Sequence, residues 1–509
     1  ADVDETDLIE ALGEDDETDV ILGYVESVND GRKFIDVASR VTRKKPVVIL
    51  KSGRTSAGAR AASSHTGSLA GADTAYEAAF RQCGVFRANT VEEFFDFARV
   101  LSGRTLPADN RIAIVTNAGG PGIIATDAVE SSLLRMADLA ETTVSALTEA
   151  LPPQANRHNP VDVLGDARAD RYRTAFRIVG ADPNVSAVLT ILTPQTSTEV
   201  EETAAAVIEA SEATDKPIVA TFMGSQSVRP AWRLLDKAGV ANFPRPDQAV
   251  KAMETLYRYG QWRGGAPSDA PRYAFDDGLI RKTIAGAAER GHTTLAERDA
   301  RDIAEACGIA LPKSVFAADE EAAVEAAGQV GYPVVLKISS DDILHKSDAG
   351  GVKVRLADAE AVRTAFRAIM DSARRYKPDA RLDGVLVQQM APSGREVIIG
   401  VNRDAQFGPV IMFGLGGIYV EVLKDVTFRV APLTLRDARE MVSEIRAARI
   451  LQAFRGDPPA DVEALAECLT RVSQLAVEYP ELTECDLNPL RVYPEGQGVM
   501  AVDVRFGLA

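Results

Sequence analysis

Short apolar segments alternate with helix-like segments in the first half of the chain, and this alternation constrains the fold most. Residues 20–25 and 47–50 have the apolar, β-branched composition of buried strands, and residues 31–41 between them have a helix-like pattern. Strand, helix, strand is the order that builds a parallel sheet, because parallel strands need a crossover connection. The order returns where a strand predicted over 112–116 precedes a helix predicted over 123–131. We therefore predict an α/β fold with two parallel sheets.

A stretch of small, polar and proline residues divides the chain after residue 263. It reads Gly-Gly-Ala-Pro-Ser-Asp-Ala-Pro from Gly264 to Pro271, which is the composition of a linker. The region beyond it begins with helices, and several of its later strands are close enough in sequence to pair antiparallel. We predict four parts: an α/β domain over 1–107, a second over 108–263, a linker over 264–274 and a third domain over 275–509.

The composition indicates which kinds of partner the protein can bind and in which compartment we expect it. A chain of 509 residues is long enough for roughly three domains. Its net charge of −17 argues against a nucleic-acid partner, because a polyanion would be repelled. No apolar run reaches the roughly 18 residues that a membrane span needs, and no secretory signal opens the chain. The four cysteines are scattered without metal-ligand spacing, so we expect reduced thiols and a cytoplasmic location.

One of the four histidines, His65, lies in a run of small residues from Ala61 to Gly71, ahead of a helix predicted over 72–81. Small neighbours let an anionic group approach the imidazole, and Gly67 permits a sharp turn. A histidine near a helix start can carry a phosphoryl group that faces free backbone N–H groups. The alternative reading is an ordinary surface histidine in a loop.

Lysines and glycines mark the third domain as a candidate phosphate-binding region. Lys337 ends a buried strand, where an ammonium group usually meets a phosphate or carboxylate, although a snorkelling surface lysine fits equally well. Gly350 and Gly351 precede a strand with Lys353, a pattern that can close over a polyphosphate or form an ordinary hairpin turn. The strand that ends at Gln389 can edge a base-binding cleft, and plain core is the alternative.

The C-terminal segment contains a predicted hairpin that can hold a cation. Two strand-like segments flank a turn over residues 494–498. Paired positions in an antiparallel hairpin sum to a constant, so Asn488 and Asp503 should lie nearly opposite each other. Asp486 shares a strand face with Asn488. These oxygen ligands suit Mg²⁺ when phosphates complete the shell, and a polar cross-strand pair without metal is the alternative.

Together these residues resemble the ATP-grasp domain of the NDP-forming acyl-CoA synthetases, which are relatives of succinyl-CoA synthetase. The resemblance rests on Lys337, the Gly350–Gly351 loop, Glu396, the glycine cluster from Gly414 to Gly417 and the motif from Asp486 to Leu490. It implies two flavodoxin-like parallel-sheet domains followed by an ATP-grasp domain, with ATP or ADP, Mg²⁺ and CoA as cofactors. Residues matching Asn488 and Asp503 hold Mg²⁺ in that family, and we expect Asp486 to assist. The expected cofactor-binding residues are Lys337, Gly350, Gly351, Lys353, Gln389, Glu396, Gly119, Gly120 and Gly122.

The resemblance extends over essentially the whole chain. The segment from Ser64 to Gly71 resembles the family's phosphohistidine loop, which makes His65 the expected phosphoryl carrier. Glu26 matches a glutamate that orients the phosphohistidine. The turn from Asn117 to Gly122 resembles a loop whose helix N-terminus points N–H groups at it. His345 resembles a histidine that relays phosphate in the acetate-type, ADP-forming branch, so the expected catalytic residues are His65, Glu26 and His345.

The family's N-terminal CoA-binding domain has no counterpart here, since no Gly-x-Gly-x-x-Gly follows a first strand. The first flavodoxin-like domain is also expected to be N-terminally incomplete, so we expect either that these residues were removed or that a partner chain supplies them. The expected assembly is a homo-oligomer or a complex with such a partner. The resemblance implies an enzyme that interconverts acyl-CoA, ADP and phosphate with a carboxylic acid, CoA and ATP. Three alternatives stay open: a regulatory acyl-CoA or nucleotide sensor on the same scaffold, a succinate–CoA ligase, and an ATP-grasp ligase that joins a carboxylate to an amine.

Overall fold

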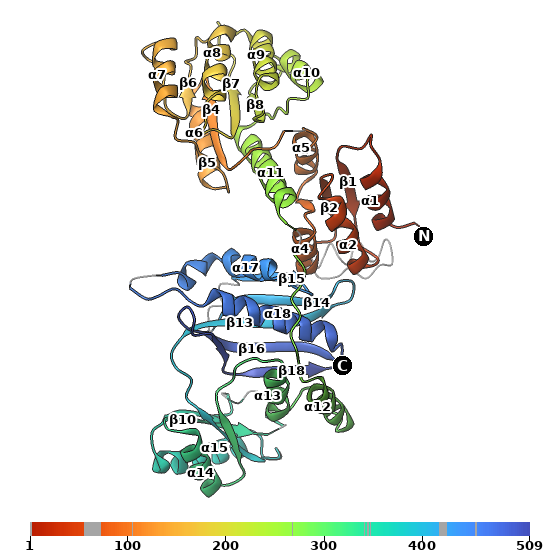
Figure 1. Ribbon diagram of the computed structural model, residues 1–509, viewed down its shortest axis with the longest axis vertical. Helices are drawn as coiled ribbons and strands as arrows, with labels where there is room; N and C mark the ends of the chain where they lie inside the picture. Colours follow the sequence, from red (N-terminus) through yellow and green to blue (C-terminus); the bar gives the residue numbers. More distant parts are fainter. Residues whose placement is uncertain are drawn as a thin grey trace. The chain divides into compact units, whose positions relative to one another are not determined.

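The computed structural model (Figure 1) divides into two compact units, one of residues 1–70 with 80–266 and the other of residues 71–79 with 267–509. None of the helices that it describes is both long and apolar enough to cross a membrane. The residues described are 3–54, 73–103, 105–266, 268–340, 342–343, 346, 348–416, 425–453 and 456–509.

The first sheet of the N-terminal unit has three parallel strands in the order β1-β2-β3: β1 (Ile21–Val25), β2 (Val47–Lys51) and β3 (Phe86–Ala88). The helix predicted over 31–41 is confirmed as α2 (Gly31–Val41). It begins there because the Asp30 side chain accepts hydrogen bonds from the backbone N–H groups of Arg32 and Lys33. The other helices are α1 (Glu5–Glu14) and α5 (Val91–Leu101), and most of α4 (Asp73–Gln82) belongs to the second unit.

The second sheet is also parallel, with the order β5-β4-β7-β8 and with β6 paired to β4: β4 (Arg111–Thr116), β5 (Arg135–Met136), β6 (Val161–Asp162), β7 (Ala187–Leu192) and β8 (Ile218–Phe222). The short strands β5 and β6 pair with opposite ends of β4. Between them the side chain of Asn159 accepts from Ile114 N at 2.9 Å and donates to Ile112 O at 2.8 Å. The Asn159 side chain thus provides hydrogen bonds to this edge of β4 between the short strands β5 and β6.

Helices cover both faces of this second sheet: α6 (Gly119–Glu130), α7 (Glu141–Ala150), α8 (Ala169–Gly180), α9 (Val200–Glu212), α10 (Arg229–Lys237) and α11 (Pro246–Gly264). Successive residues of β4 enter two different cores. Ala113 and Val115 pack with residues of α8, α9 and α10, whereas Ile112 and Ile114 pack with residues of α6 and α11. Burial on both faces explains why the strands are continuous apolar runs.

The two parallel sheets share one of these cores. Val48 of β2 and Phe97 of α5 belong to the same buried cluster as Ile112 and as Leu256 of α11. Residues predicted as two domains therefore pack as one unit, and a domain division at residue 107 stays a prediction. The linker predicted over 264–274 falls between α11 and the first helix of the second unit.

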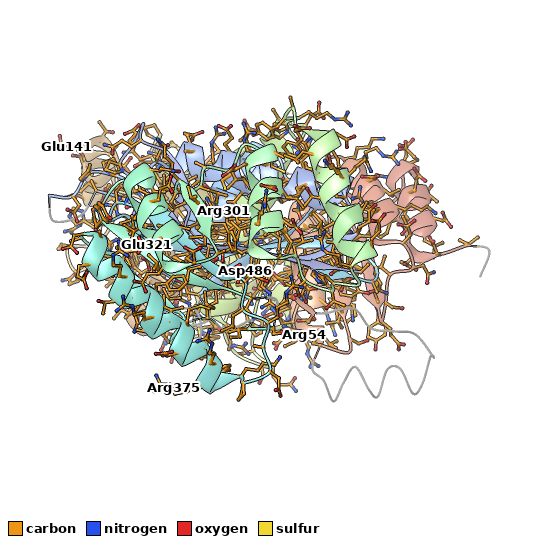
Figure 2. The ribbon with its side chains drawn as sticks, turned by 90° about the horizontal axis from the view of Figure 1, so that it is seen from below. Arg54, Glu141, Arg301, Glu321, Arg375 and Asp486 are labelled. Atoms are coloured by element: carbon orange, nitrogen blue, oxygen red, sulfur yellow. The ribbon has the colours of Figure 1, made fainter. Side chains whose placement is uncertain are left out.

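The C-terminal unit contains two antiparallel sheets. The smaller has the order β11-β10-β12-β9, with α14 and α15 packed on it: β9 (Ser314–Ala317), α14 (Glu320–Val330), β10 (Val334–Ser339), β11 (Val352–Leu356), α15 (Ala359–Tyr376) and β12 (Gly384–Gln389). Glu321 lies in the first turn of α14 and Arg375 in the last turn of α15 (Figure 2). Antiparallel pairing of these strands confirms the prediction for this region.

The larger sheet has the order β15-β14-β13-β16-β17, and β18 also pairs with β16. Its strands are β13 (Arg395–Asp404), β14 (Gly408–Leu415), β15 (Val426–Val430), β16 (Leu482–Val492), β17 (Val499–Ala501) and β18 (Val504–Leu508). One face is covered by helices, whose apolar residues form a large core with the strands. These helices are α12 (Asp277–Glu289), α13 (Glu297–Ala306), α17 (Leu435–Glu444), the 3₁₀ helix over Arg446–Leu451 and α18 (Val462–Glu478).

Candidate functional site

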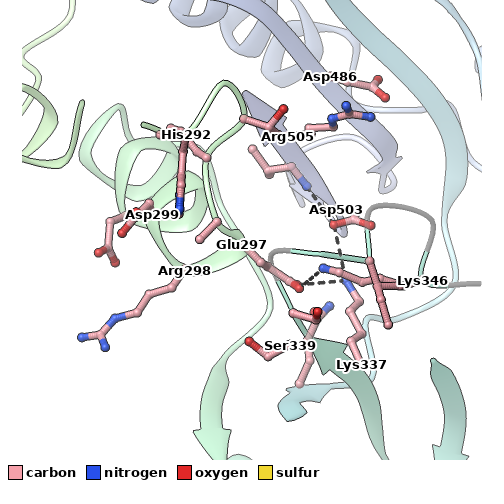
Figure 3. A pocket seen from close by; sticks show the side chains of 18 of the residues that line it. His292, Glu297, Arg298, Asp299, Lys337, Ser339, Lys346, Asp486, Asp503 and Arg505 are labelled. Carbon is pink, nitrogen blue, oxygen red and sulfur yellow. Dashed lines mark hydrogen bonds and ion pairs between the residues drawn. The ribbon is translucent and has the colours of Figure 1, made fainter. Parts of the chain in front are cut away.

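A cleft of about 1760 Å³ lies within the C-terminal unit, between the two antiparallel sheets and helices α12 and α13. Its wall includes Lys337 and Gln388 from the smaller sheet and Asp486 and Asn488 from the larger one. Figure 3 shows Lys337, Lys346 and Asp503 gathered around Glu297, with Asp486 and Arg505 close by. Charged groups from five separate parts of the sequence thus converge in one cavity, as expected of a site for a charged ligand.

The predicted C-terminal hairpin is present with the predicted register. Leu490 pairs with Ala501 in the β16–β17 ladder, and Leu487 pairs with Val504 in the β16–β18 ladder. Both ladders belong to one register, which places Asn488 opposite Asp503, and Asn488 N donates to Asp503 O at 3.2 Å. β16 runs through Asn488 without a break, whereas the opposite strand is interrupted at Val502 and Asp503, between β17 and β18. The two side chains predicted to bind a cation therefore lie together at the cleft wall.

Lys337 is nearly inaccessible, with 5% of the residue exposed, and it is surrounded by oxygen atoms. Its Nζ donates to Val502 O at 3.1 Å and lies 3.6 Å from both Glu297 Oε1 and Asp503 Oδ1. Lys346 Nζ forms an ion pair with the other oxygen of Glu297. Burial opposes ionisation of Glu297, but Lys346 and Lys337 outweigh it and hold the pKa of this carboxyl below its ordinary value.

Asp486 has a buried carboxylate oxygen, Oδ1, with no hydrogen-bond partner. Burial is the main cause that raises its pKa, and the nearby carboxylate of Asp503 raises it further, while Arg505 acts in the opposite direction. A desolvated carboxylate beside a second one is an arrangement that a divalent cation would relieve. Within the described residues no three His, Cys, Asp or Glu side chains form a metal cluster. The oxygens of Asp486, Asn488 and Asp503 therefore fit Mg²⁺ only with ligand or water oxygens completing the shell.

Two residues predicted to bind the cofactor, Gln389 and Lys353, do not line the cleft, so their binding role stays a prediction. Gln389 is exposed, whereas Gln388 is 1% exposed, lines the cleft, and has a buried Oε1 without a partner. In the strand that contains Lys353, Val352 and Val354 line the cleft. Side chains alternate along a strand, so neighbouring residues lie on opposite faces of the sheet.

Gly350, Gly351 and Glu396, which were predicted to bind the nucleotide, do not line the cleft. Gly351 N donates to Lys346 O at 2.7 Å, and Gly350 has a φ of +66°. These glycines shape the backbone that carries Lys346. Glu396 forms an ion pair at 3.2 Å with Arg491, whose guanidinium is part of the cleft wall.

The N-terminal unit contains the second group of predicted residues. Glu26 directly follows β1, and its Oε2 is buried without a hydrogen-bond partner. Asn117, at the end of β4, is 2% exposed and connects β4 to β7: it donates to Thr193 O at 2.9 Å and accepts from Thr193 N at 2.8 Å. His65 and His345, the two predicted phosphoryl carriers, lie outside the described residues.

The helix predicted over 123–131 begins earlier than expected, because α6 begins at Gly119. Gly120 and Pro121 lie in its first turn, where N–H groups have no intrahelical partner and proline is tolerated. Gly119 and Gly120 are exposed, whereas Gly122 is buried, with Thr116 Cγ2 3.2 Å from where a Cβ would stand. The glycine-rich segment is thus the helix N-terminus itself, with exposed backbone at its tip.

Glu297 and Gln388 are among the cleft residues that were not predicted from the sequence. An acidic residue in the first turn of a helix is common, so Glu297 carries no distinguishing signal. Gln388 could have been found, because it pairs with Val335, which shares a strand face with Lys337.

Models of known protein families match residues in both units. A model of the ATP-grasp domain matches residues 286–508, a model of the succinyl-CoA ligase like flavodoxin domain matches residues 1–101, and a model of the Ligase-CoA domain matches residues 112–266. The order is the one predicted, flavodoxin-like domains before an ATP-grasp domain, and with the parallel sheets it confirms the predicted fold class.

Similar proteins cover nearly the whole chain. Acetate–CoA ligase [ADP-forming] I of Archaeoglobus fulgidus is 45% identical over an alignment of 511 positions, which covers 99% of this chain and 72% of that protein. 4-Hydroxybutyrate–CoA ligase [ADP-forming] of Nitrosopumilus maritimus is 38% identical over 506 residues, again 99% and 72%. Acetate–CoA ligase [ADP-forming] I subunit beta of Pyrococcus furiosus is 53% identical over 211 residues, 42% of this chain and 90% of that subunit. The chain therefore belongs to the ADP-forming acyl-CoA ligases, a family of acid–thiol ligases.

Proposed function

We propose that this protein interconverts the CoA thioester of a small carboxylic acid, ADP and phosphate with the free acid, CoA and ATP, through a phosphohistidine at His65. The observation that carries the proposal is the cleft, where Lys337 and Lys346 stand beside the oxygen set of Asp486, Asn488 and Asp503. Buried cations beside unsatisfied carboxylate oxygens suit a polyphosphate that arrives with Mg²⁺.

The cleft residues have separate roles in this proposal. Lys337 and Lys346 bind phosphate oxygens and counter the charge that develops during transfer. Asp486, Asn488 and Asp503 hold Mg²⁺, which when bound neutralises nucleotide phosphate charge. Gln388 lines the cleft and has a buried Oε1 without a partner, and we assign to this oxygen a hydrogen bond from a ligand donor.

The transfer itself divides into steps that each break one bond and form one bond. Phosphate attacks the thioester carbonyl and displaces CoA, which leaves an acyl phosphate. An imidazole nitrogen of His65 attacks phosphorus and releases the carboxylate, and Glu26 supports the positive charge of the ring. A β-phosphate oxygen of ADP then takes the phosphoryl group and restores the imidazole. We assign to His345 a relay role before this last step, and to the exposed N–H groups at Gly119 and Gly120 the binding of phosphoryl charge.

The relatives also support a proposal on substrate and assembly. Two of them are named for acetate and one for 4-hydroxybutyrate, so we assign a short, unbranched acid as the acyl group. One relative is named as the beta subunit of its enzyme, and we propose that this chain works together with a partner chain or a second copy of itself.

The test is ATP formation by the full-length protein from acetyl-CoA, ADP, phosphate and Mg²⁺, followed with a coupled assay. The wild type is expected to form ATP, and Lys337→Met is expected to lose about a hundredfold or more of kcat, on the scale of a lost transition-state donor. Lys313→Met is the matched control, because Lys313 is exposed and does not line the cleft. Absence of ATP with acetyl-CoA, propionyl-CoA and 4-hydroxybutyryl-CoA would contradict the proposed function.

A further inference from the structure

Glu297 is the first residue of α13, and its position is set by the larger sheet. The segment before it continues that sheet: Leu295 N donates to Phe506 O at 3.0 Å, and Leu508 N donates to Thr293 O at 2.8 Å. Thr294 also forms a β-bridge with Gly507. The start of α13 is therefore attached to β18, the strand that directly follows Asp503.

The Glu297 carboxylate lies between two ammonium groups. Oε1 is 3.6 Å from Lys337 Nζ, and Oε2 is in contact with Lys346 Nζ (Figure 3). Its side chain is 12% exposed, and that of Lys337 is 7% exposed. Asp503 lies 3.6 Å from Lys337 as a second anion. Two lysines so close together and so poorly hydrated would repel each other without a bridging anion.

We propose that Glu297 is a positioning residue for phosphoryl transfer, which holds Lys337 and Lys346 at a fixed separation so that both face the same phosphoryl group. This inference rests on the proposed function, because it assigns the two lysines to that transfer. Glu297 itself contacts neither nucleotide nor phosphoryl group in this account. Its contribution is preorganisation: the ammonium groups are already placed when charge develops on the phosphoryl oxygens.

A positioning role predicts that a change at Glu297 lowers kcat but does not weaken the binding of ADP. Replacing Glu297 by Gln removes one negative charge from the cleft, so electrostatics alone would leave ADP binding unchanged or tighter. The same change releases the two lysines from their bridge, so the transition state loses fixed partners. We therefore expect Glu297→Gln to lower kcat by about tenfold to a hundredfold, the range for groups that orient a functional residue, without weakening the Kd for ADP.

The experiment compares wild type, Glu297→Gln and Glu297→Asp in the ATP-forming assay, with Kd for ADP measured by calorimetry. Asp keeps the bridging charge on a shorter side chain, so it is expected to recover part of the lost kcat. Glu305→Gln is the matched control: Glu305 belongs to the same helix and pairs with Arg301 at 3.7 Å, but its side chain is 60% exposed and does not line the cleft. This control is expected to behave like the wild type.

A second measurement does not depend on turnover. Acetylation rates of Lys337 and Lys346, measured by mass spectrometry on the folded protein, are expected to rise several-fold in Glu297→Gln and to stay unchanged in Glu305→Gln. Wild-type kcat retained in Glu297→Gln, a loss confined to ADP binding, or unchanged lysine reactivity would each overturn the inference. A wild type that forms no ATP contradicts the proposed function instead, and the labelling result still decides whether Glu297 holds the two lysines.

Discussion

Gly351→Ala tests whether the glycine pair acts through the backbone that carries Lys346. A Cβ at Gly351 would lie 2.4 Å from Ile338 Cγ2 and 3.0 Å from Lys346 O. Ile338 is fully buried in β10, and Ile338 N donates to Gly351 O at 2.7 Å. The new methyl group therefore cannot be accommodated unless either β10 or the Lys346 segment moves.

The size of the effect follows from this overlap. Inserting a methyl group into a packed site typically costs about 1–3 kcal/mol in the free energy of unfolding. Because Gly351 N also donates to Lys346 O, displacement weakens the ion pair between Lys346 and Glu297. We expect Gly351→Ala to reduce hydrogen-exchange protection of the β10 amides and to lower kcat in the ATP-forming assay.

Gly328→Ala is the matched control. Gly328 lies inside α14, and no atom comes within 4 Å of a Cβ built there. Alanine is favoured over glycine in a helix by about 0.5–1 kcal/mol, so this variant should be slightly more stable than the wild type. Equal hydrogen-exchange protection of β10 in Gly351→Ala and the wild type would refute the reasoning.

Three further predictions concern other parts of the molecule. Asn117→Ala leaves two polar groups of Thr193 unpaired, at about 1–3 kcal/mol each, so urea unfolding should show a less stable N-terminal unit. The pKa of the Glu297 carboxyl is lower in the folded protein than its ordinary value of 4.5, so the ionised carboxylate stabilises the fold fully above pH 4.5. This contribution is lost as the pH falls through the pKa of the folded state. Thermal melts at decreasing pH should therefore show a shrinking stability difference between the wild type and Glu297→Gln. Burial raises the pKa of the Cys83, Cys307 and Cys468 thiols to about 12 and holds the pKa of the Cys485 thiol well above its ordinary value. A thiol reagent at pH 8 should therefore label these four buried cysteines far more slowly in the native protein than in the unfolded one.

The fold and the C-terminal hairpin could be predicted from short-range sequence patterns. Continuous apolar strands separated by helices indicate a parallel sheet, because both faces of each strand are buried. The pairing of Asn488 with Asp503 followed from one constraint, the constant sum of paired positions around a single turn. The same rule places Leu490 opposite Ala501.

The sequence says less where one position or one distant contact decides which residue lines the cleft. The cleft is lined by Gln388 and not by its neighbour Gln389, because successive residues of a strand lie on opposite faces. The start of α6 was misjudged because Gly119 and Gly120 resemble a loop until the first-turn position of Pro121 is considered. Glu297 gains its importance from Lys337 and Lys346, which are brought to it only by the tertiary fold.

Transfer of label from ATP that carries a labelled γ-phosphate tests directly whether His65 becomes a phosphohistidine. The wild type is expected to acquire an acid-labile, base-stable phosphoryl group, and peptide mapping should place it on His65. His65→Ala is expected to keep no such label except on His345. Label of this kind at any other site in His65→Ala, or a wild type that takes up none, would contradict the account.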